Sequence, residues 1–395
     1  MEMNYAKRLE SFQAGIFAIL NEKKEELIRQ GREVYNLSVG TPDFQPAPHV
    51  MEAMTKACQD PENYKYALVD MPELLDAVVG HYERRYGVHI TTDEVMSING
   101  SQEGMAHIAM ALCDPEDVVL VPNPGYPIFS IGPFLCGATP VTYDLKPENH
   151  FMPDFDSIPE DVARKSKFII VSYPLNPVCV TADDSVYEAL IQFARKYNII
   201  VINDNAYSDI IYDGRKGGSF LAYEGAKEVG VEFYSLSKSY NLTGARISFV
   251  VGHKDIIRKF KTVRSQIDYG VFKPVQIGAI AALNGSQEAV VAQCEEYERR
   301  NKALCGGLRR IGWNVPDSEG TMFVWAPIPE GYESSRAFCM EMVEKAGVLC
   351  TPGDAFGSCG EGYVRFALVL PPEELTKAVQ AVKDSGILEA GKAEK

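Results

Sequence analysis

Ser235-Leu-Ser-Lys238-Ser-Tyr-Asn-Leu-Thr-Gly-Ala-Arg246-Ile-Ser-Phe-Val-Val-Gly252 places a reactive amine, several hydroxyls and a fixed cation on one short turn. The apolar runs Val231 to Leu236 and Ile247 to Val251 predict strands on either side, so Lys238 stands at a strand end. A partly desolvated lysine beside another cation has a lowered pKa and can form an imine with an aldehyde. Serine hydroxyls and a planar guanidinium suit a phosphate group. The stretch therefore predicts a site for a compound that carries both an aldehyde and a phosphate.

These residues resemble the class I and II aminotransferases of fold type I, which use pyridoxal 5'-phosphate (PLP). The family signature is Ser-x-Ser-Lys followed by Gly-x-Arg, here Ser235-Leu-Ser-Lys238 and Gly244-Ala-Arg246. The resemblance covers nearly the whole chain and is closest to the LL-diaminopimelate aminotransferase-like branch, as Gly100-Ser-Gln-Glu-Gly-Met-Ala-His107 indicates. It implies PLP bound to Lys238, with Ser235, Ser237 and Arg246 around its phosphate.

A chain of 395 residues with 46% hydrophobic content is long enough for a large α/β domain and a smaller companion. The resemblance implies a mainly parallel seven-stranded sheet sandwiched by helices, plus a smaller α+β domain. We expect residues 1–44 to join the small domain, residues 45–285 to form the PLP-binding domain and residues 286–395 to form the small domain. A long helical stretch from Val275 to Ile311 is expected to bridge them.

The charge and the cysteine content of the chain limit which binding partners and which cell compartment we expect. The chain has 39 basic and 54 acidic residues, a net charge of -15, which argues against nucleic acid and anionic membranes as partners. No apolar run is long enough for a signal peptide or a membrane span, so we expect a cytoplasmic protein. Nine scattered cysteines without a Cys-x-x-Cys pair indicate neither a metal site nor a disulfide framework.

A further part of the phosphate site is predicted where the strand Val95 to Ile98 meets a following helix through Asn99-Gly100-Ser101-Gln102. Unpaired backbone N–H groups and the helix dipole both favour a phosphate there. We expect Gly100, Ser101 and Gln102 to hold the PLP phosphate. The glycine patterns of dinucleotide and nucleoside triphosphate sites are absent from the sequence.

An aspartate at the end of an apolar strand predicts a cationic partner. Asp204 follows Ile199-Ile-Val-Ile-Asn203, and burying its carboxylate is costly unless a cation pairs with it. A protonated pyridinium nitrogen would be that cation and would make the ring an electron sink. Tyr207, three residues on, is expected to hydrogen-bond the ring oxygen.

The resemblance implies two further residues that contact the pyridine ring of PLP. Tyr126, in Pro-Gly-Tyr126-Pro, is expected to stack on the pyridine ring, and Asn176 to hydrogen-bond its oxygen. The family motif Asn-Pro-Thr-Gly is Asn176-Pro-Val-Cys179 here. Because Cys179 lacks the conformational freedom of glycine, we expect the turn to differ.

Arg365 lies in the apolar strand Tyr363 to Leu368, where an unpaired charge would cost several kcal/mol, so it needs an anion. The resemblance implies that Arg365 and Asn176 bind the substrate α-carboxylate, with Gly40 beside it. It also implies a homodimer in which a tyrosine reaches the PLP phosphate of the partner subunit. We assign that role to Tyr66, with Tyr64 in reserve; Asp70 stands nearby where glycine is common.

The predicted function is PLP-dependent transfer of an amino group between an L-amino acid and a 2-oxo acid by a ping-pong mechanism. Lys238 is the expected proton shuttle, with Asp204 and Tyr207 tuning the cofactor. One alternative is a PLP-dependent carbon-sulfur β-lyase, which would share these residues. Another is a non-catalytic PLP-sensing regulatory protein, which the acidic charge and retained catalytic positions disfavour. Aspartate, alanine, aromatic and diaminopimelate substrates remain open.

Overall fold

The computed structural model describes residues 3–12 and 16–390. They form two compact units. The large unit is Thr41–Glu298 with Glu319–Thr321, and the small unit comprises the described parts of Met1–Gly40, Arg299–Ser318 and Met322–Lys395. The domain boundaries predicted from the sequence, after residues 44 and 285, stay predictions.

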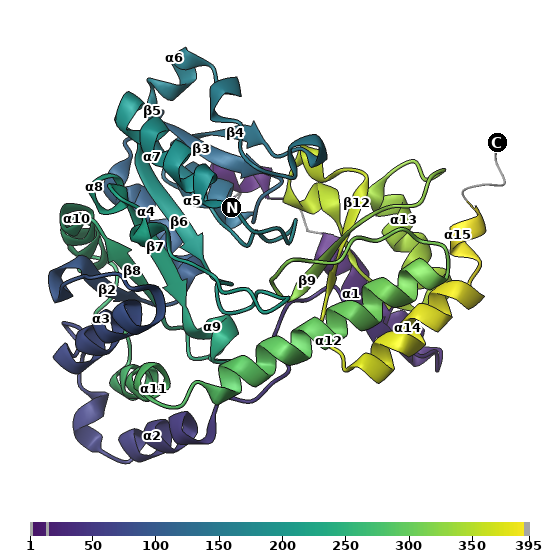
Figure 1. Cartoon of the computed structure of the whole chain (residues 1–395), viewed down its shortest axis with the longest axis horizontal. Helices are drawn as coiled ribbons and strands as arrows, with labels where there is room; N and C mark the ends of the chain where they lie inside the picture. Colours follow the sequence, from purple (N-terminus) through teal and green to yellow (C-terminus); the bar gives the residue numbers. More distant parts are fainter. Residues whose placement is uncertain (1–2, 13–15, 391–395) are drawn as a thin grey trace. The chain divides into compact units, whose positions relative to one another are not determined.

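A seven-stranded sheet forms the centre of the large unit, in the order β2-β8-β7-β6-β5-β3-β4 (Figure 1). Its strands are β2 Val95–Ile98, β3 Val118–Asn123, β4 Thr139–Asp144, β5 Ser166–Val171, β6 Ile200–Asn205, β7 Gly230–Ser235 and β8 Ser248–Gly252. β8 is antiparallel to β2 and β7, and the other neighbouring pairs are parallel. The expected mainly parallel sheet is therefore confirmed. Because β8 is reversed, its first residue lies at the edge where the other strands end.

Near-continuous apolar runs explain why these strands are central. Val119, Val121 and Ile169 are fully buried, as expected for parallel strands covered on both faces by helices. Figure 1 shows the helices packed around the sheet. The helices of the large unit are α2 Pro48–Cys58, which packs on α11, and α3 Pro72–Tyr86, α4 Ser101–Leu112, α5 Ile128–Leu135, α6 Glu160–Ala163, α7 Asp184–Tyr197, α8 Ala226–Val229, α9 Leu236–Ser239, α10 Lys254–Arg264 and α11 Lys273–Asn284.

The long helical stretch expected from Val275 to Ile311 is two helices, α11 and α12 Glu288–Arg310. Gly285 follows the end of α11, and a Cβ atom there would lie 2.3 Å from Nε2 of His49 and 2.6 Å from the carbonyl oxygen of Ala281. The expectation of one continuous helix is therefore wrong, because Gly285 has an extended backbone (φ -82°, ψ -172°) that ends α11. α12 contributes residues to both units.

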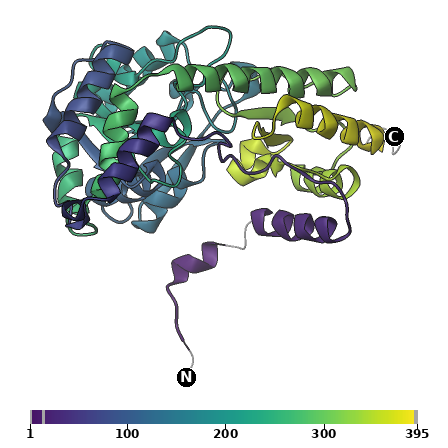
Figure 2. The same ribbon diagram turned by 90° about the horizontal axis from the view of Figure 1, so that it is seen from below.

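The small unit combines short strands with helices. Its main sheet has the antiparallel order β11-β12-β9, and β1 pairs with β10 in parallel. The second half of α12 runs beside α14, where Gly307 packs on Val379 (Figures 1 and 2). The elements are α1 Ile16–Arg29, β1 Tyr35–Asn36, β9 Phe323–Pro327, α13 Ser335–Glu341, β10 Val348–Leu349, β11 Thr351–Pro352, β12 Tyr363–Ala367, α14 Pro372–Asp384 and α15 Ile387–Ala390. None of the helices described in either unit has the length and apolar character needed to cross a membrane.

Candidate active site

The predicted phosphate loop and the predicted phosphate-binding arginine lie against each other. Gly100 precedes α4 with φ +91°, and a Cβ atom at this position would lie 2.1 Å from Nη2 of Arg246. Arg246 also donates from Nη1 to the carbonyl oxygen of Thr243 at 2.9 Å. The hydroxyl of Ser101, the first residue of α4, is buried and has no hydrogen-bond partner among the residues that the structure describes. A cation, a helix N-terminus and a buried hydroxyl therefore meet at one point.

Lys238 lies on α9, directly after β7, and its backbone is held from two sides. The hydroxyl of Ser235 accepts a hydrogen bond from the amide of Ser237 at 3.1 Å and so caps α9. Ser248 donates its hydroxyl proton to the same oxygen at 2.9 Å across the β7-β8 pair. Gln293 donates to the carbonyl oxygen of Lys238 at 2.7 Å. Sequence reasoning missed Ser248 and Gln293, since neither belongs to a motif.

Asp204 lies near the end of β6, two strands from β8 in the sheet order. Its Oδ1 atom is buried and has no hydrogen-bond partner within the described chain. Burial and, second to it, the negative charge of Glu232 together raise the pKa of this carboxyl to about 7. A cation placed beside Asp204 would relieve both effects.

The remaining predicted ring contacts follow the ends of neighbouring strands. Tyr126 follows β3 and donates from its hydroxyl to Oε1 of Gln102 at 3.2 Å. Asn176 and Tyr207 are buried after β5 and β6, and Ser172 joins those two strand ends by donating to the carbonyl oxygen of Asp204 at 2.9 Å. Parallel strands bring these residues to the edge of the sheet that also carries Lys238.

Cys179 takes the backbone conformation that we expected only glycine to take. Its φ is +63°, in the left-handed region, and its side chain is 1% exposed. The amide of Cys179 donates to the carbonyl oxygen of Leu175 at 2.7 Å, and Thr321 donates to its sulfur at 3.3 Å. Cys179 therefore takes a left-handed conformation despite its side chain, and the expectation that this turn differs from the family's stays a prediction.

Arg365 and Gly40, the predicted carboxylate-binding residues of the small unit, both contact Phe323. The guanidinium carbon of Arg365 lies 4.1 Å from the ring centroid of Phe323 and 4.6 Å from that of Phe356. Nη2 donates to the carbonyl oxygen of Ser38 at 3.1 Å, and Arg365 is 5% exposed. A Cβ atom at Gly40 would lie 2.3 Å from Cζ of Phe323. The two aromatic rings were not identified from the sequence.

Tyr66, predicted to serve a partner subunit, is 76% exposed and packs edge to face on Tyr269, with ring centroids 5.0 Å apart. Tyr64 packs in the same manner on Phe272. Asp70, the residue found where glycine is common, accepts hydrogen bonds from the amide of Ser97 at 2.9 Å and from its hydroxyl. Asp70 therefore ties the loop that carries Tyr66 to β2.

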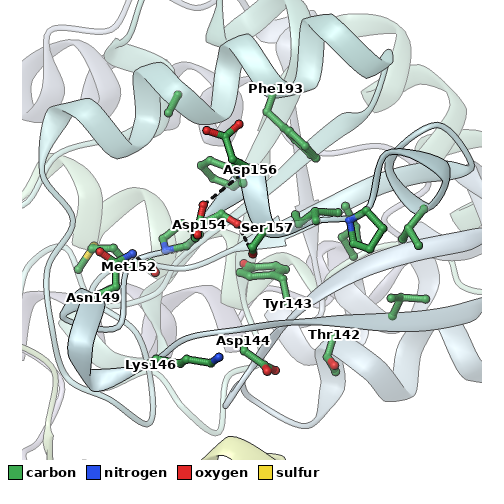
Figure 3. Close-up of a pocket in the computed structure, with 18 of the residues that line it drawn as sticks. Thr142, Tyr143, Asp144, Lys146, Asn149, Met152, Asp154, Asp156, Ser157 and Phe193 are labelled. Carbon is green, nitrogen blue, oxygen red and sulfur yellow. Dashed lines mark hydrogen bonds between the residues drawn. The ribbon is translucent and has the colours of Figure 1, made fainter.

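A cavity of about 1040 Å³ lies beside β4 and α7 in the large unit (Figure 3). Its polar groups include Asp154, which accepts hydrogen bonds from the amide of Asp156 at 3.2 Å and from the hydroxyl of Ser157 at 2.7 Å. None of the predicted site residues lines this cavity. The candidate site therefore lies at the ends of the parallel strands, where the predicted residues gather, and not in this cavity.

Comparisons with known proteins identify the family of the chain. The family model for aminotransferase class I and II matches residues 32–382. The chain is 41% identical over 379 residues to LL-diaminopimelate aminotransferase from Dehalococcoides mccartyi, covering 95% of this chain and 97% of that protein. It is 42% identical over 382 residues to the protein of the same name from Aquifex aeolicus, covering 96% and 98%. The structure of substrate-bound BacF from Bacillus subtilis superposes with a TM-score of 0.93 at 34% identity, covering 97% and 98%.

These findings confirm the resemblance, the fold type and the predicted class of reaction. The chain belongs to the class I and II aminotransferases, PLP-dependent enzymes that transfer amino groups between amino acids and 2-oxo acids.

Proposed function

We propose that PLP binds at the edge of the large unit's sheet where the parallel strands end. The observation that carries this proposal is the buried Oδ1 atom of Asp204, which has no partner in the described chain and which a protonated ring nitrogen would satisfy. The buried hydroxyl of Ser101 suits the phosphate in the same way, at the N-terminus of a helix. The proposed cofactor-binding residues are Gly100, Ser101, Gln102, Tyr126, Asn176, Asp204, Tyr207, Ser235, Ser237, Lys238 and Arg246.

Each catalytic residue has a separate proposed task. Bound PLP supplies an electron sink for the bonding electrons of the substrate's α-carbon. Lys238 holds the cofactor through its amine and, when that amine is free, moves the α-proton of the substrate. Asp204 keeps the ring nitrogen protonated, and Tyr207 donates to the ring oxygen. Arg365 orients the substrate carboxylate, because its planar guanidinium can donate two parallel hydrogen bonds.

The assignment of Lys238 is tested by absorbance spectroscopy. We expect the purified protein to bind PLP with a visible absorbance band, and a single amino acid to convert it to the pyridoxamine spectrum without any oxo acid. Lys238→Ala should remove the band and the turnover, whereas Lys259→Ala, on the exposed face of α10, should change neither. Full turnover in Lys238→Ala would refute the assignment. Pyruvate release with an unchanged PLP band would instead indicate β-elimination.

We propose LL-diaminopimelate as the amino donor. Two relatives that are 41% and 42% identical over nearly the whole chain bear the name LL-diaminopimelate aminotransferase. The test compares kcat/KM for LL-diaminopimelate, aspartate, alanine and phenylalanine with 2-oxoglutarate as acceptor. We expect LL-diaminopimelate to give the highest kcat/KM of the four donors. A higher kcat/KM for any of the other three donors would refute the substrate proposal and leave the reaction class unchanged.

We also propose a homodimer formed through one exposed apolar patch on the large unit. The patch comprises Tyr64, Tyr66, Leu68, Val69, Tyr269 and Phe272. Adjacent exposed apolar side chains of this size mark interaction surfaces. A second copy would cover the patch and place the partner subunit's Tyr66 at the PLP phosphate, as the sequence resemblance implies.

A cytoplasmic location is proposed on the state of the cysteines. None of the nine forms a disulfide in the part of the chain that the structure describes, and five of them are at least partly exposed. Free thiols persist in reducing compartments. Fractionation of cells that produce the protein tests this location, and recovery outside the cytoplasm would refute it.

A further inference from the structure

A second carboxylate is buried in the sheet beside Asp204. Glu232 lies on β7 and is 0% exposed. Its carboxylate accepts five hydrogen bonds, all from neutral groups. The donors are the hydroxyls of Tyr82 at 2.9 Å and Ser219 at 2.8 Å, the amides of Asn203 at 2.9 Å and Asn205 at 3.1 Å, and the backbone N–H of Phe220 at 2.8 Å. Several donors on one carboxylate favour its charged form.

The register of the sheet places this charge close to Asp204. Glu232 pairs with Asn203 on β6, and Asp204 is the next residue along that strand. With neighbouring strands about 4.8 Å apart and a rise of about 3.3 Å per residue, the two backbones are roughly 6 Å apart. The side chains point to opposite faces of the sheet, so the carboxylates do not share a proton.

The electrostatics of both groups agree with this geometry. Burial raises the pKa of Glu232, and hydrogen bonds from Asn205, Ser219 and other side chains oppose that rise. After burial, the charge of Glu232 is the second cause that raises the pKa of Asp204. A negative charge behind Asp204 therefore increases the preference of this region for a cation.

We propose that Glu232 is a positioning residue for the cofactor, whose buried charge acts through Asp204 to favour a ligand with a protonated ring nitrogen. The proposal rests on the proposed role of Asp204. It predicts that Glu232 contributes to the distinction between PLP and a ring that lacks the nitrogen, and that it contributes nothing specific to the phosphate.

Glu232→Gln can remove the charge while keeping the shape. Oδ1 of Asn203 and Oδ1 of Asn205 are both buried without a partner among the described residues. The two hydrogens of the new glutamine NH₂ group can be accepted by the hydroxyl oxygens of Tyr82 and Ser219, which reverse their direction. Asn205 keeps its hydrogen bond to the carbonyl oxygen of Gly218 at 3.1 Å. The glutamine oxygen continues to accept from Asn203 and from the N–H of Phe220.

The experiment measures the dissociation constants of the apoprotein for PLP and for 1-deaza-PLP, in which C–H replaces the ring nitrogen, at one fixed pH. A unit charge about 10 Å away at an effective dielectric constant of about 20 changes the preference for a cation by about tenfold. We expect Glu232→Gln to lower the PLP preference by about that factor. Glu103→Gln, the same change beside the phosphate loop, should affect both ligands equally.

Three outcomes decide the proposal. Equal weakening of both ligands in Glu232→Gln would give Glu232 a structural role only and overturn the proposal. An unchanged preference in Asp204→Asn would refute the role of Asp204 itself, whereas loss of preference in Asp204→Asn but not in Glu232→Gln would refute Glu232 alone. Should Glu232→Gln not fold, the double variant Tyr82→Phe/Ser219→Ala replaces it. That variant removes two donors and favours neutral Glu232, so its PLP preference must also fall.

Discussion

Burial raises the pKa of Asp204 to about 7 from its usual 3.8, and this affects the stability of the cofactor-free chain. Between these two values the folded state binds more protons than the unfolded state, so the free energy of unfolding falls as pH rises. The contribution of Asp204 is fully present below about pH 4 and is lost as pH rises through 7, amounting to a few kcal/mol at about 1.4 kcal/mol per pKa unit.

We therefore expect urea unfolding of the apoprotein to show lower stability at pH 8 than at pH 5. Asp204→Asn should remove the part of this slope that Asp204 causes, while the part due to Glu232 remains. Saturating PLP should also reduce the slope, because a cation beside Asp204 lowers its pKa. An identical slope in Asp204→Asn and in the natural sequence would contradict the raised pKa.

Gly100→Ala tests the contact between the phosphate loop and Arg246. The φ of +91° costs a residue with a side chain about 1–2 kcal/mol, and the new Cβ atom would displace the guanidinium. We expect lower stability and at least about tenfold weaker PLP binding. Gly312→Ala is the matched control, because Gly312 has φ +95° and no atom within 4 Å of the added Cβ. It should lose comparable stability and keep its PLP affinity; equal PLP affinity in both variants would contradict the assigned contact.

At the scale of secondary-structure elements, the loop before α3 is held to β2 by two hydrogen bonds from Ser97 to the carboxylate of Asp70. Removing its carboxylate leaves the amide of the buried Ser97 without its partner, at a cost of about 1–3 kcal/mol. We expect Asp70→Ala to lower the free energy of unfolding by about 2 kcal/mol. Ser97→Ala removes only the hydroxyl and should cost about 1 kcal/mol. Denaturant unfolding of both variants measures the difference, and a larger loss in Ser97→Ala would contradict the role of the amide.

The elements that the sequence predicted well are those with a strong local pattern. The strands expected at Val95 to Ile98, Ile199 to Asn203, Val231 to Leu236 and Ile247 to Val251 lie within two residues of the observed ones, because turns bound their apolar runs. The break at Gly285 was missed, although glycine directly after Asn284 is a local signal for the end of a helix. The left-handed conformation of Cys179 was not predicted either, since its contact with Thr321 joins residues remote in sequence.

In the candidate site, too, the sequence identified the residues that have a local signal and missed those that meet only through the fold. Motifs pointed to Lys238 and Gly100, and the physical cost of a charge in an apolar strand pointed to Asp204 and Arg365. Glu232 carries that same signal within Val231-Glu-Phe-Tyr and was overlooked. The rings that flank Arg365 had no local signal, because Phe323 and Phe356 meet it only through the fold.

At the scale of the whole molecule, the exposed patch around Tyr66 and Tyr269 predicts the oligomeric state. We expect Leu68→Asp to shift a dimer toward monomer, because a charge at the buried centre of an interface remains unpaired. Sedimentation at several protein concentrations measures the change. Val291→Asp places the same charge on an exposed apolar position of α12 and should leave the dimer intact. A dimer unaffected by Leu68→Asp would place the interface elsewhere.

β2 is one of the two edge strands of the seven-stranded sheet, and its neighbour is β8, about 150 residues later in the chain. At a synthesis rate of about 5–20 residues per second, the ribosome takes roughly 8 to 30 s to add the residues between them. During that interval Val95, Met96 and Ile98, all buried in the finished fold, lack their strand partner. An unpaired apolar strand can join another chain. The nascent chain therefore needs protection by chaperones for longer than its local helices would suggest.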